Sequence, residues 1–574
     1  MSLNMITLNN RNNQENNEND VTIELLIEHE RTHRIPHTYS FRSYCCYNTP
    51  MSNTNSGIEI TVKPVVSISE ESDANHSVMN ASQDVQSSTN DTSSSKETTL
   101  NSKSSSFMST ESIGKIMWKL TYPSLIAKIT SALYAVCDSM FIGQLAGKTS
   151  EERSISLSAV SLAMPIEQGI VHSLAMMVSQ GGSTLYGQSI GEKNIEKGKR
   201  VIGNTYFLEI LMFLIMACIF SFLCKPILQL IGATDEAGTL TPGLEYANTL
   251  LIGSICYNFY ISSADLTRGQ GSALFSCLLS ITSAICNIIG DPIFIKLFNL
   301  KIMGASVSTV IAGGISGVIG FIFMRSKNAA IQWSFKDMIP DWKLCGRILM
   351  TGMSGLVSGF SGAFVTIVSN LLVIKYSEYS VDDIHTTAIV GAWGTLGRVY
   401  FISFMPLIAL AQGVLPMLAF SSGAKLNKRF IACAKLTLYW MFGITAVVEI
   451  VLLVFAKQIG LIFSDEPIFI EFFVPALRIM VSGVILQPFV MGLFPMLQSV
   501  GKGGLAGMLL ALKTCFVLLI FQFGISAIMG SYWGAVYAYP LTEVVSTIIA
   551  IIMYCKNKKY FYGTQELPVV VQDK

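Results

Sequence analysis

Charged residues are scarce in this chain of 574 residues. Asp, Glu, Lys and Arg make up only 13% of it, about half the usual fraction in soluble proteins, while 51% is hydrophobic and the mean hydropathy is +0.50. The formal net charge is +1, and no basic stripe interleaved with aromatic residues occurs, so we expect no nucleic-acid partner. The composition indicates a protein that lies largely within a membrane.

Three other features are missing. The 12 cysteines form no CxxC pair, and most lie in apolar segments, which is typical of reduced packing residues. The first long apolar run starts near residue 117, so we expect no N-terminal signal peptide. The motif HERTH (His29, Glu30, His33) has the H-E-x-x-H spacing, but it lies in a polar stretch shortly before Pro36, and we expect no zinc site there.

The polarity of the chain is concentrated at its N-terminus. Residues 1–110 are rich in Ser, Thr and Asn, as in DVQSSTNDTSSSKETT. Such a segment cannot bury enough apolar surface to offset the entropy lost on ordering. We therefore predict a disordered cytoplasmic tail there, followed by a polytopic membrane domain.

About twelve apolar runs are long enough to cross a bilayer, which takes roughly 20 residues per helix. The predicted spans are 117–145, 156–182, 202–224, 246–267, 272–297, 302–325, 346–375, 386–420, 431–456, 470–498, 504–529 and 533–555.

The basic residues of short loops predict the orientation of these spans. The richer loops alternate with poorer ones, and the C-terminus is also basic. The basic positions are Lys193, Lys197, Lys199, Arg200, Lys327, Lys336, Lys343, Arg347, Lys425, Lys428, Arg429, Lys556, Lys558 and Lys559. Both termini are therefore predicted to be cytoplasmic, which agrees with an even number of spans.

The two halves of the membrane domain resemble each other. Residues 180–201 align with 412–433 at an offset of 232, so that Gly181 meets Gly413 and Gly191 meets Gly423. Six spans per half give a parallel repeat, with a substrate path expected between the halves. The predicted fold is all-α, with twelve transmembrane helices in two six-helix lobes. The predicted division is a tail (1–110), an N-lobe (111–326), a cytoplasmic linker (327–345), a C-lobe (346–556) and a C-terminal cytoplasmic tail (557–574).

Asp291 lies in the apolar run CNIIGDPIFIK, about 9 Å from the outer end of the fifth span. Asp138 in the first span and Thr309 in the sixth lie at a similar depth, about 10 Å from the same side. Asn287 and Tyr134 each lie four residues before one of the aspartates, on the same helical face. The sequence therefore predicts one polar site from three helices.

Ionisable groups within a membrane usually face a cavity and carry function. Two carboxylates near each other can share a proton, and carboxylate, amide and hydroxyl oxygens suit Na⁺. The alternative is that Asp291 pairs with Lys296 near the interface. The repeat-related positions are Asn370 and Phe521, so the acidic pair belongs to the N-lobe alone. For the remaining intramembrane polar residues we expect internal pairing or snorkelling. They are Lys128, Glu167, His172, Glu209, Arg398, Glu449, Arg478, Lys513 and Glu543.

Residues 112–556 resemble the multidrug and toxic compound extrusion (MATE) transporters. The resemblance is carried by TYPSLIAKITSALYAVCDSMFIGQLAG, AVSLAMPI, GGSTLYGQSIGEKNIEKGKR, NIIGDPIFI and GASVSTVIA. Asn287, Asp291 and Pro292 match the family's N-x-x-x-D-P motif. Asp138 matches its first-span acid, and Pro123 the proline at which that helix can bend.

This resemblance implies a role for each matching residue. In the DinF-like branch, the residues corresponding to Asp138, Asn287, Asp291 and Thr309 form the cation-coupling site, and Tyr134 resembles a tyrosine beside it. The NorM-like branch uses acids in its seventh and tenth spans, whereas this chain has none in the seventh and Arg478 in the tenth. Departures from the family pattern are Gly290 before Asp291 and the intramembrane Lys128.

We therefore expect a secondary active exporter of small amphipathic or cationic molecules, coupled to H⁺ or Na⁺, and not an enzyme. It is expected to need no cofactor, to act as a monomer in the lipid bilayer, and to reside in the plasma membrane or a vacuolar or vesicular one. Two alternatives stay open. One is a flippase for lipid-linked oligosaccharides, which would need the cations Lys128, Arg478 and Lys513; the other is a non-transporting scaffold or receptor.

Overall fold

Helices make up nearly all of the described chain in the computed structural model. The structure describes residues 108, 111–231, 233–235, 238–376, 384–463 and 467–562. All of them belong to the second of the chain's two units, Ser95–Lys574. Apart from Met108, the predicted N-terminal tail with its HERTH motif lies outside the described residues, as do residues 563–574 of the predicted C-terminal tail. Met108 is buried against Gly271, so the packed unit begins slightly earlier than the predicted end of the tail at residue 110.

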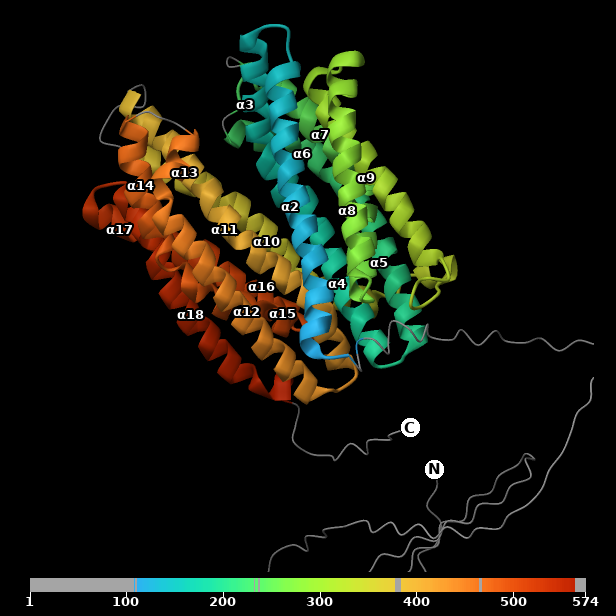
Figure 1. The fold of residues 1–574 in the computed structure, drawn as a ribbon. Helices are drawn as coiled ribbons and strands as arrows, with labels where there is room; N and C mark the ends of the chain where they lie inside the picture. The colour runs from blue at the N-terminus through green and yellow to red at the C-terminus, as the bar shows by residue number, and fades with distance from the viewer. Residues whose placement is uncertain are drawn as a thin grey trace, which may run out of the picture. The chain divides into compact units, whose positions relative to one another are not determined.

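The described residues of the first half of this unit form six helical rods, several of them divided into consecutive segments; Figure 1 shows them in blue to yellow-green. The rods of this N-lobe are α2 (Ile113–Leu145); α3 (Ser150–Ile166), η1 (Glu167–His172) and α4 (Ser173–Gly191); α5 (Ile195–Ile215), η2 (Met216–Phe220) and α6 (Ser221–Ile231); α7 (Leu240–Gly269); α8 (Ala273–Pro292) and η3 (Ile293–Leu297); and α9 (Lys301–Arg325).

The second half repeats the pattern after a short linker that contains η4 (Phe335–Met338). The rods of this C-lobe are α10 (Trp342–Lys375); α11 (Ile384–Gly423); α12 (Asn427–Val454) and α13 (Ala456–Phe463); α14 (Pro467–Val481), η5 (Val484–Leu486) and α15 (Gln487–Ser499); α16 (Gly503–Ala511), η6 (Leu512–Leu518) and α17 (Leu519–Met529); and α18 (Trp533–Tyr562). The predicted all-α fold of two six-helix lobes is confirmed.

Helix ends reach beyond the predicted spans, because an apolar run marks only the part of a helix that meets lipid. Thus α18 continues to Tyr562, where Phe561 is buried and stacks on Phe430. Within the described residues, nine segments are long and apolar enough to cross a membrane. The three rods that fall short are α2, α3–η1–α4 and α7, and these carry many of the N-lobe's polar residues. Polar residues such as Asp138, Glu167 and Tyr246 lower the mean hydropathy of these three rods.

Prolines shape two of these rods. Pro165 lies two residues before the π-helical segment η1, and Pro292 is the last residue of α8, directly before the π-helical segment η3. Proline has no N–H to donate, so the regular ladder of helix hydrogen bonds is disturbed at that point. Short π segments of this kind occur often at functional sites. Here η1 begins with Glu167, and η3 follows Asp291.

The two lobes meet at two glycines, Gly191 and Gly423. Both lie near those helix ends that lead into the loops rich in Lys and Arg. Gly191 in α4 faces the carbonyl of Phe420 in α11, and Gly423 in α11 faces the carbonyl of Gln188 in α4. Both pairs are related by the offset of 232 found in the sequence repeat, so the contact is reciprocal, as across a two-fold axis. We call this contact the glycine seam. A Cβ at either glycine would collide with backbone.

The linker between the lobes is docked on the N-lobe. Trp333 is buried, stacks on Tyr206 with ring centroids 5.3 Å apart, and donates to the Met324 carbonyl at 3.1 Å. A capping box of Ser334 and Asp337 then starts η4. The linker therefore forms part of the N-lobe packing before α10 begins.

Candidate functional site

Asp291 is fully buried near the C-terminal end of α8, and neither of its carboxylate oxygens makes a hydrogen bond of normal geometry to a described residue; the Ser308 hydroxyl is a nearby donor that acts on it. Lys296 is exposed, so the interface pair that the sequence left open is not formed. Gly290 has a packing reason: a Cβ there would meet the side chain of Ser308, whose hydroxyl donates to the Asn287 carbonyl at 3.0 Å. Glycine thus lets α9 approach the turn that holds Asp291.

Asn287 and Thr309 join α8 to α9. The Asn287 Nδ2 donates to Thr309 Oγ1 at 3.0 Å, and the Thr309 hydroxyl donates to the Ala305 carbonyl at 3.1 Å. These bonds use the Thr309 hydroxyl proton and one N–H of the Asn287 amide, and they leave Asn287 Oδ1 buried without a partner among the described residues. The amide oxygen is therefore a spare acceptor one helical turn from Asp291.

Asp138 and Tyr134 come from α2, which packs along α8. Asp138 is partly buried, and its Oδ1 has no hydrogen-bond partner among the described residues. The negative charges of Asp291 and Glu167 act on Asp138, and all three carboxylates act on Tyr134. The structure thus brings Asp138, Tyr134 and Asp291 within electrostatic reach of one another.

Glu167 makes the internal pairing that was expected of it, but its place near Asp138 and Tyr134 is an addition that the sequence did not predict. It lies at the start of η1, and Tyr246 in α7 donates to its Oε2 at 3.2 Å. The signal that could have found it is Pro165, two residues earlier, which precedes the π segment. We call Asp138, Glu167 and Asp291 the acidic level.

Further hydrogen bonds join the second rod to α7, among them that from the Ser183 hydroxyl to the Asp265 carbonyl at 2.6 Å. His172 Nδ1 and the Tyr257 hydroxyl are 2.5 Å apart, and Ser179 donates to Asp265 Oδ2 at 2.8 Å. With Glu167–Tyr246 these bonds form a polar ladder that runs from the acidic level toward the glycine seam. Asp265 also holds Arg268 in an ion pair of 2.9 Å.

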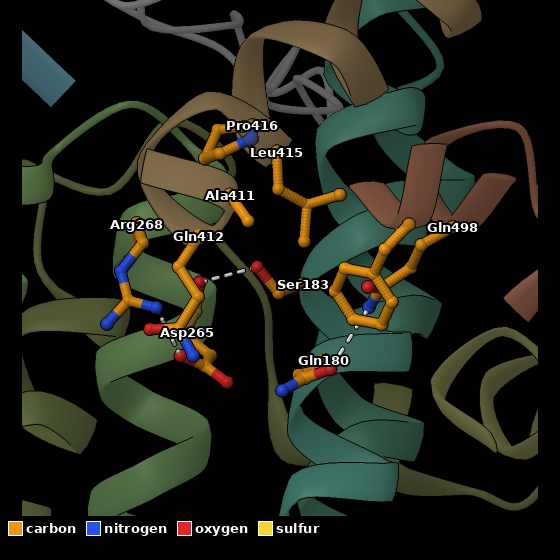
Figure 2. Close-up of a pocket in the computed structure, with 10 residues that line it drawn as sticks. Gln180, Ser183, Asp265, Arg268, Ala411, Gln412, Leu415, Pro416 and Gln498 are labelled. Atoms are coloured by element: carbon orange, nitrogen blue, oxygen red, sulfur yellow. Dashed lines mark hydrogen bonds and ion pairs between the residues drawn. The ribbon is translucent and has the colours of Figure 1, made fainter. Parts of the chain in front are cut away.

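A small cavity lies between the lobes near the end of this ladder (Figure 2). Its volume of about 20 Å³ is room for about one water molecule. Gln498 of α15 donates to Gln180 of α4 at 3.3 Å across it, and Figure 2 shows Asp265 and Arg268 at its N-lobe wall. No substrate passes here without separation of the lobes, so the path is closed at the glycine seam.

Pro123 lies inside α2, which runs as one helix from Ile113 to Leu145. The preceding turn touches the C-lobe, because a Cβ on Gly413 would meet Leu120 and Thr121. Pro123 is therefore close to the lobe contact and about 15 residues, or roughly 22 Å of helix, from Asp138. A bend there would act on the contact between the lobes and not directly on the acidic level.

The C-lobe holds a different buried network. Lys513 in η6 and Glu543 in α18 are both buried and form an ion pair of 2.8 Å. Tyr400 and Gln487 donate to Glu543 Oε1 at 3.0 and 3.2 Å. The expected internal pairing is therefore found for these two residues. Arg478 is exposed and donates to the Leu453 carbonyl at 3.3 Å.

An apolar cavity of about 360 Å³ lies between η1, α6 and α10. Its walls include Pro165, Ile170, Phe220 and Phe360. Drug-sized ligands occupy pockets of about 300–1,000 Å³ that are mostly apolar with few polar groups. This cavity could accommodate the apolar part of such a molecule.

Comparison with known proteins gives one family and one fold. The family model MatE matches residues 123–293 and 356–512, one segment in each lobe. The multidrug export protein MepA of Staphylococcus haemolyticus is 23% identical over 448 residues, covering 78% of this chain and 94% of the relative. MepA of Staphylococcus aureus strain NCTC 8325 is 22% identical over 464 residues, covering 80% and 98%.

Two solved structures share the fold. One is titled an outward-facing conformation of a multidrug resistance MATE family transporter of the MOP superfamily; it has a TM-score of 0.73 at 20% identity and covers 80% of this chain and 99% of the other. The other is a MOP superfamily transporter from Pyrococcus furiosus whose title describes a binding pocket of reverse polarity. It has a TM-score of 0.70 at 20% identity, with the same coverage.

Proposed function

The chain belongs to the MATE family, and from that premise we propose that it is a secondary active exporter driven by entry of H⁺ or Na⁺ through its N-lobe. It is a multi-pass integral membrane transporter and not an enzyme. Among the relatives, MepA is named a multidrug export protein, which supports small amphipathic or cationic molecules as substrates. The proposed form is a DinF-like monomer without a cofactor.

The observation that carries the proposal is a set of buried oxygens without partners. They are Asp291 Oδ1 and Oδ2, Asn287 Oδ1 and Asp138 Oδ1, as far as the described residues show. Burying such groups without partners costs free energy, and more so for a carboxylate. A proton would neutralise one carboxylate, and Na⁺ would be bound by oxygen ligands of this kind, with Thr309 as a further donor atom. We propose Asp138, Asn287, Asp291 and Thr309 as the cation site, with Tyr134 beside it.

Antiport requires that cation and substrate favour different states of the lobes. The basic loops support a cytoplasmic location for the glycine seam and for both termini. The membrane that we propose is the plasma membrane, with a vacuolar or vesicular membrane as the alternative. The conformation described would then be closed to the cytoplasm. A cysteine at Asn299 should react with an impermeant reagent from outside the cell, and one at Ile195 should not; the reverse pattern would overturn the orientation.

The flippase alternative is weakened. It needs several free cations for a pyrophosphate, but Glu543 neutralises Lys513, and Arg478 lies exposed at a helix carbonyl. One of the three cations, Lys128, is left. No observation on the described residues favours the scaffold alternative.

The decisive experiment is efflux of a fluorescent cation from proteoliposomes with separately imposed H⁺ and Na⁺ gradients. We expect one of the gradients to drive efflux against the dye's concentration gradient, and an ionophore that collapses that gradient to stop it. Equal dye movement with and without both gradients would contradict secondary active transport.

A further inference from the structure

Lys128 is a cation in the interior of the N-lobe that the proposed cation site does not use. It lies on α2, ten residues before Asp138, which is about 15 Å along the helix. The exposed large apolar residues of α2 mark the side that faces lipid; they are Trp118, Ile126, Ile129, Leu133 and Met140. At 100° per residue, Lys128 points about 120° away from the centre of that side. It is therefore directed toward the other helices of the bundle.

The neighbours of Lys128 confirm this direction. Its charge acts on His172 in η1, and the charges of Arg268 and Asp265 in α7 act on Lys128. Lys128 is thus on the inward side of α2, within electrostatic reach of His172 in the second rod and of Asp265 and Arg268 in α7, at the end of the polar ladder nearer the glycine seam. Its side chain is half-buried and reachable by solvent.

The other charges at this depth are already balanced. Arg268 is paired with Asp265, and His172 is bonded to the hydroxyl of Tyr257. Lys128 has no hydrogen bond or ion pair within the described part of the chain, where Arg268–Asp265 and Lys513–Glu543 are the ion pairs of the interior cations. An unpaired ammonium inside a membrane protein is costly, and such groups mark substrate or ion pathways. The part of the polar ladder nearer the glycine seam therefore carries one uncompensated positive charge, that of Lys128. The acidic level at the other end carries uncompensated carboxylates.

We infer that Lys128 is an anion subsite and that the preferred substrates are zwitterionic amphiphiles, with the cationic end at the acidic level and the anionic end at Lys128. This inference rests on the proposed function, whose substrate class it narrows. Tyr257 and Tyr260, with ring centroids 6.1 Å apart on α7, provide aromatic surface between the two ends. The incoming cation would compete with the substrate's positive end, as antiport requires.

Two dyes that differ in one charge test this subsite. Rhodamine B carries a free carboxylate beside its cationic ring system, and its ethyl ester is the same cation without that carboxylate. Binding to the purified full-length protein in detergent, with no ion gradient, should be about tenfold tighter for rhodamine B than for the ester. Equal binding, or tighter binding of the ester, would overturn the inference.

Substitution of Lys128 isolates its contribution. Lys128→Gln should weaken rhodamine B binding about tenfold and leave the ester's binding unchanged. Lys128→Arg should keep most of the preference, and Lys115→Gln, at an exposed lysine of the same helix, should keep all of it. A Lys128→Gln protein with the full preference would refute the subsite. If that variant does not fold, the wild-type comparison and Lys128→Arg still decide.

These results can be separated from failure of the proposed function. Dye preference is measured without a gradient, so it is independent of coupling. A wild type that shows the preference but no gradient-driven efflux would contradict the exporter proposal alone. A wild type with driven efflux of the ester and no preference for rhodamine B would contradict the subsite alone.

Discussion

The N-lobe and the C-lobe share one scaffold but treat buried charge in opposite ways. In the N-lobe, Asp291 is buried with no partner among the described residues. In the C-lobe, Glu543 is buried with Lys513, Tyr400 and Gln487 around it. The carboxylate of Asp291 therefore lacks a group that would balance its charge, whereas the carboxylate of Glu543 has both an ion-pair partner and hydrogen-bond donors.

The positions of these groups make the contrast sharper. At the repeat offset of 230, Lys513 corresponds to Ser283 and Glu543 to Gly313. Ser283 lies four residues before Asn287, and Gly313 four residues after Thr309, so the C-lobe pair joins the two equivalent helices one turn away from the Asn287–Thr309 bond. The C-lobe thus has a tethered cation near the place where the N-lobe is proposed to bind a mobile one.

The largest effect is expected from breaking the C-lobe pair. Lys513→Ala leaves Glu543 buried without its cation, which should cost about 3–5 kcal/mol of stability. Thermal unfolding of the purified protein should show a clearly lower midpoint. Replacing both residues, as Lys513→Met with Glu543→Gln, should recover most of the loss, since the amide can still accept from Tyr400 and Gln487.

The control for this pair is Lys225→Ala, at an exposed lysine. If Lys513→Ala were as stable as this control, Glu543 would not depend on its tethered cation, and the contrast between the lobes would fail. Conversely, Asp291→Asn should not destabilise the protein, because it removes a buried charge that has no partner.

The next largest effect concerns the glycine seam, where the two lobes are equivalent. Gly191→Ala and Gly423→Ala each place a Cβ against backbone of the opposite lobe, and overpacking of this kind costs about 1–3 kcal/mol. The closed seam should lose population, and spin labels at Asn194 and Leu426 should show longer distances. Gly443→Ala is the matched control, because a Cβ there meets nothing within 4 Å. Unchanged distances in both seam variants would show that the seam is not the gate.

Neutralising the acidic pair tests the N-lobe side of the comparison. Asp291→Asn and Asp138→Asn should each fold and keep some substrate binding, but lose at least about tenfold in gradient-driven efflux, equivalent to about 1.4 kcal/mol. The double variant should lose little more, since both residues act on one cation. Asp235→Asn, an exposed loop carboxylate, and Lys296→Ala should transport normally. Normal coupled efflux in Asp291→Asn would sink the shared site.

Much of the fold, and part of the candidate site, could be predicted from the sequence for physical reasons. Apolar runs of about 20 residues reveal spans, and the repeat reveals the lobes. Asn287, Asp291 and Thr309 were found because depth along a helix can be counted from its ends. The place of Glu167 at the acidic level was missed because its partner Tyr246 lies 79 residues away, and only the packed lobe brings them together. The pairing of Lys513 with Glu543 could be expected as a type, but the partners could not be named from spacing alone.

The smallest predicted effect would distinguish the two candidate ions. Thr309→Val keeps the shape but leaves Asn287 Nδ2 unpaired, which costs about 1 kcal/mol and loosens the hold on its free oxygen. If Na⁺ is the ion, the concentration for half-maximal driven efflux should rise about fivefold, because Na⁺ needs that amide oxygen; a proton on a carboxylate does not. Thr542→Val is the matched C-lobe control: its hydroxyl also donates to the carbonyl four residues earlier, at 2.7 Å, and should not affect coupling. An equal change in both variants would trace the effect to helix packing. A fivefold change in Thr309→Val alone would assign the hydroxyl and the amide to a Na⁺ site, while unchanged H⁺-driven efflux in the same variant would assign coupling to the carboxylates.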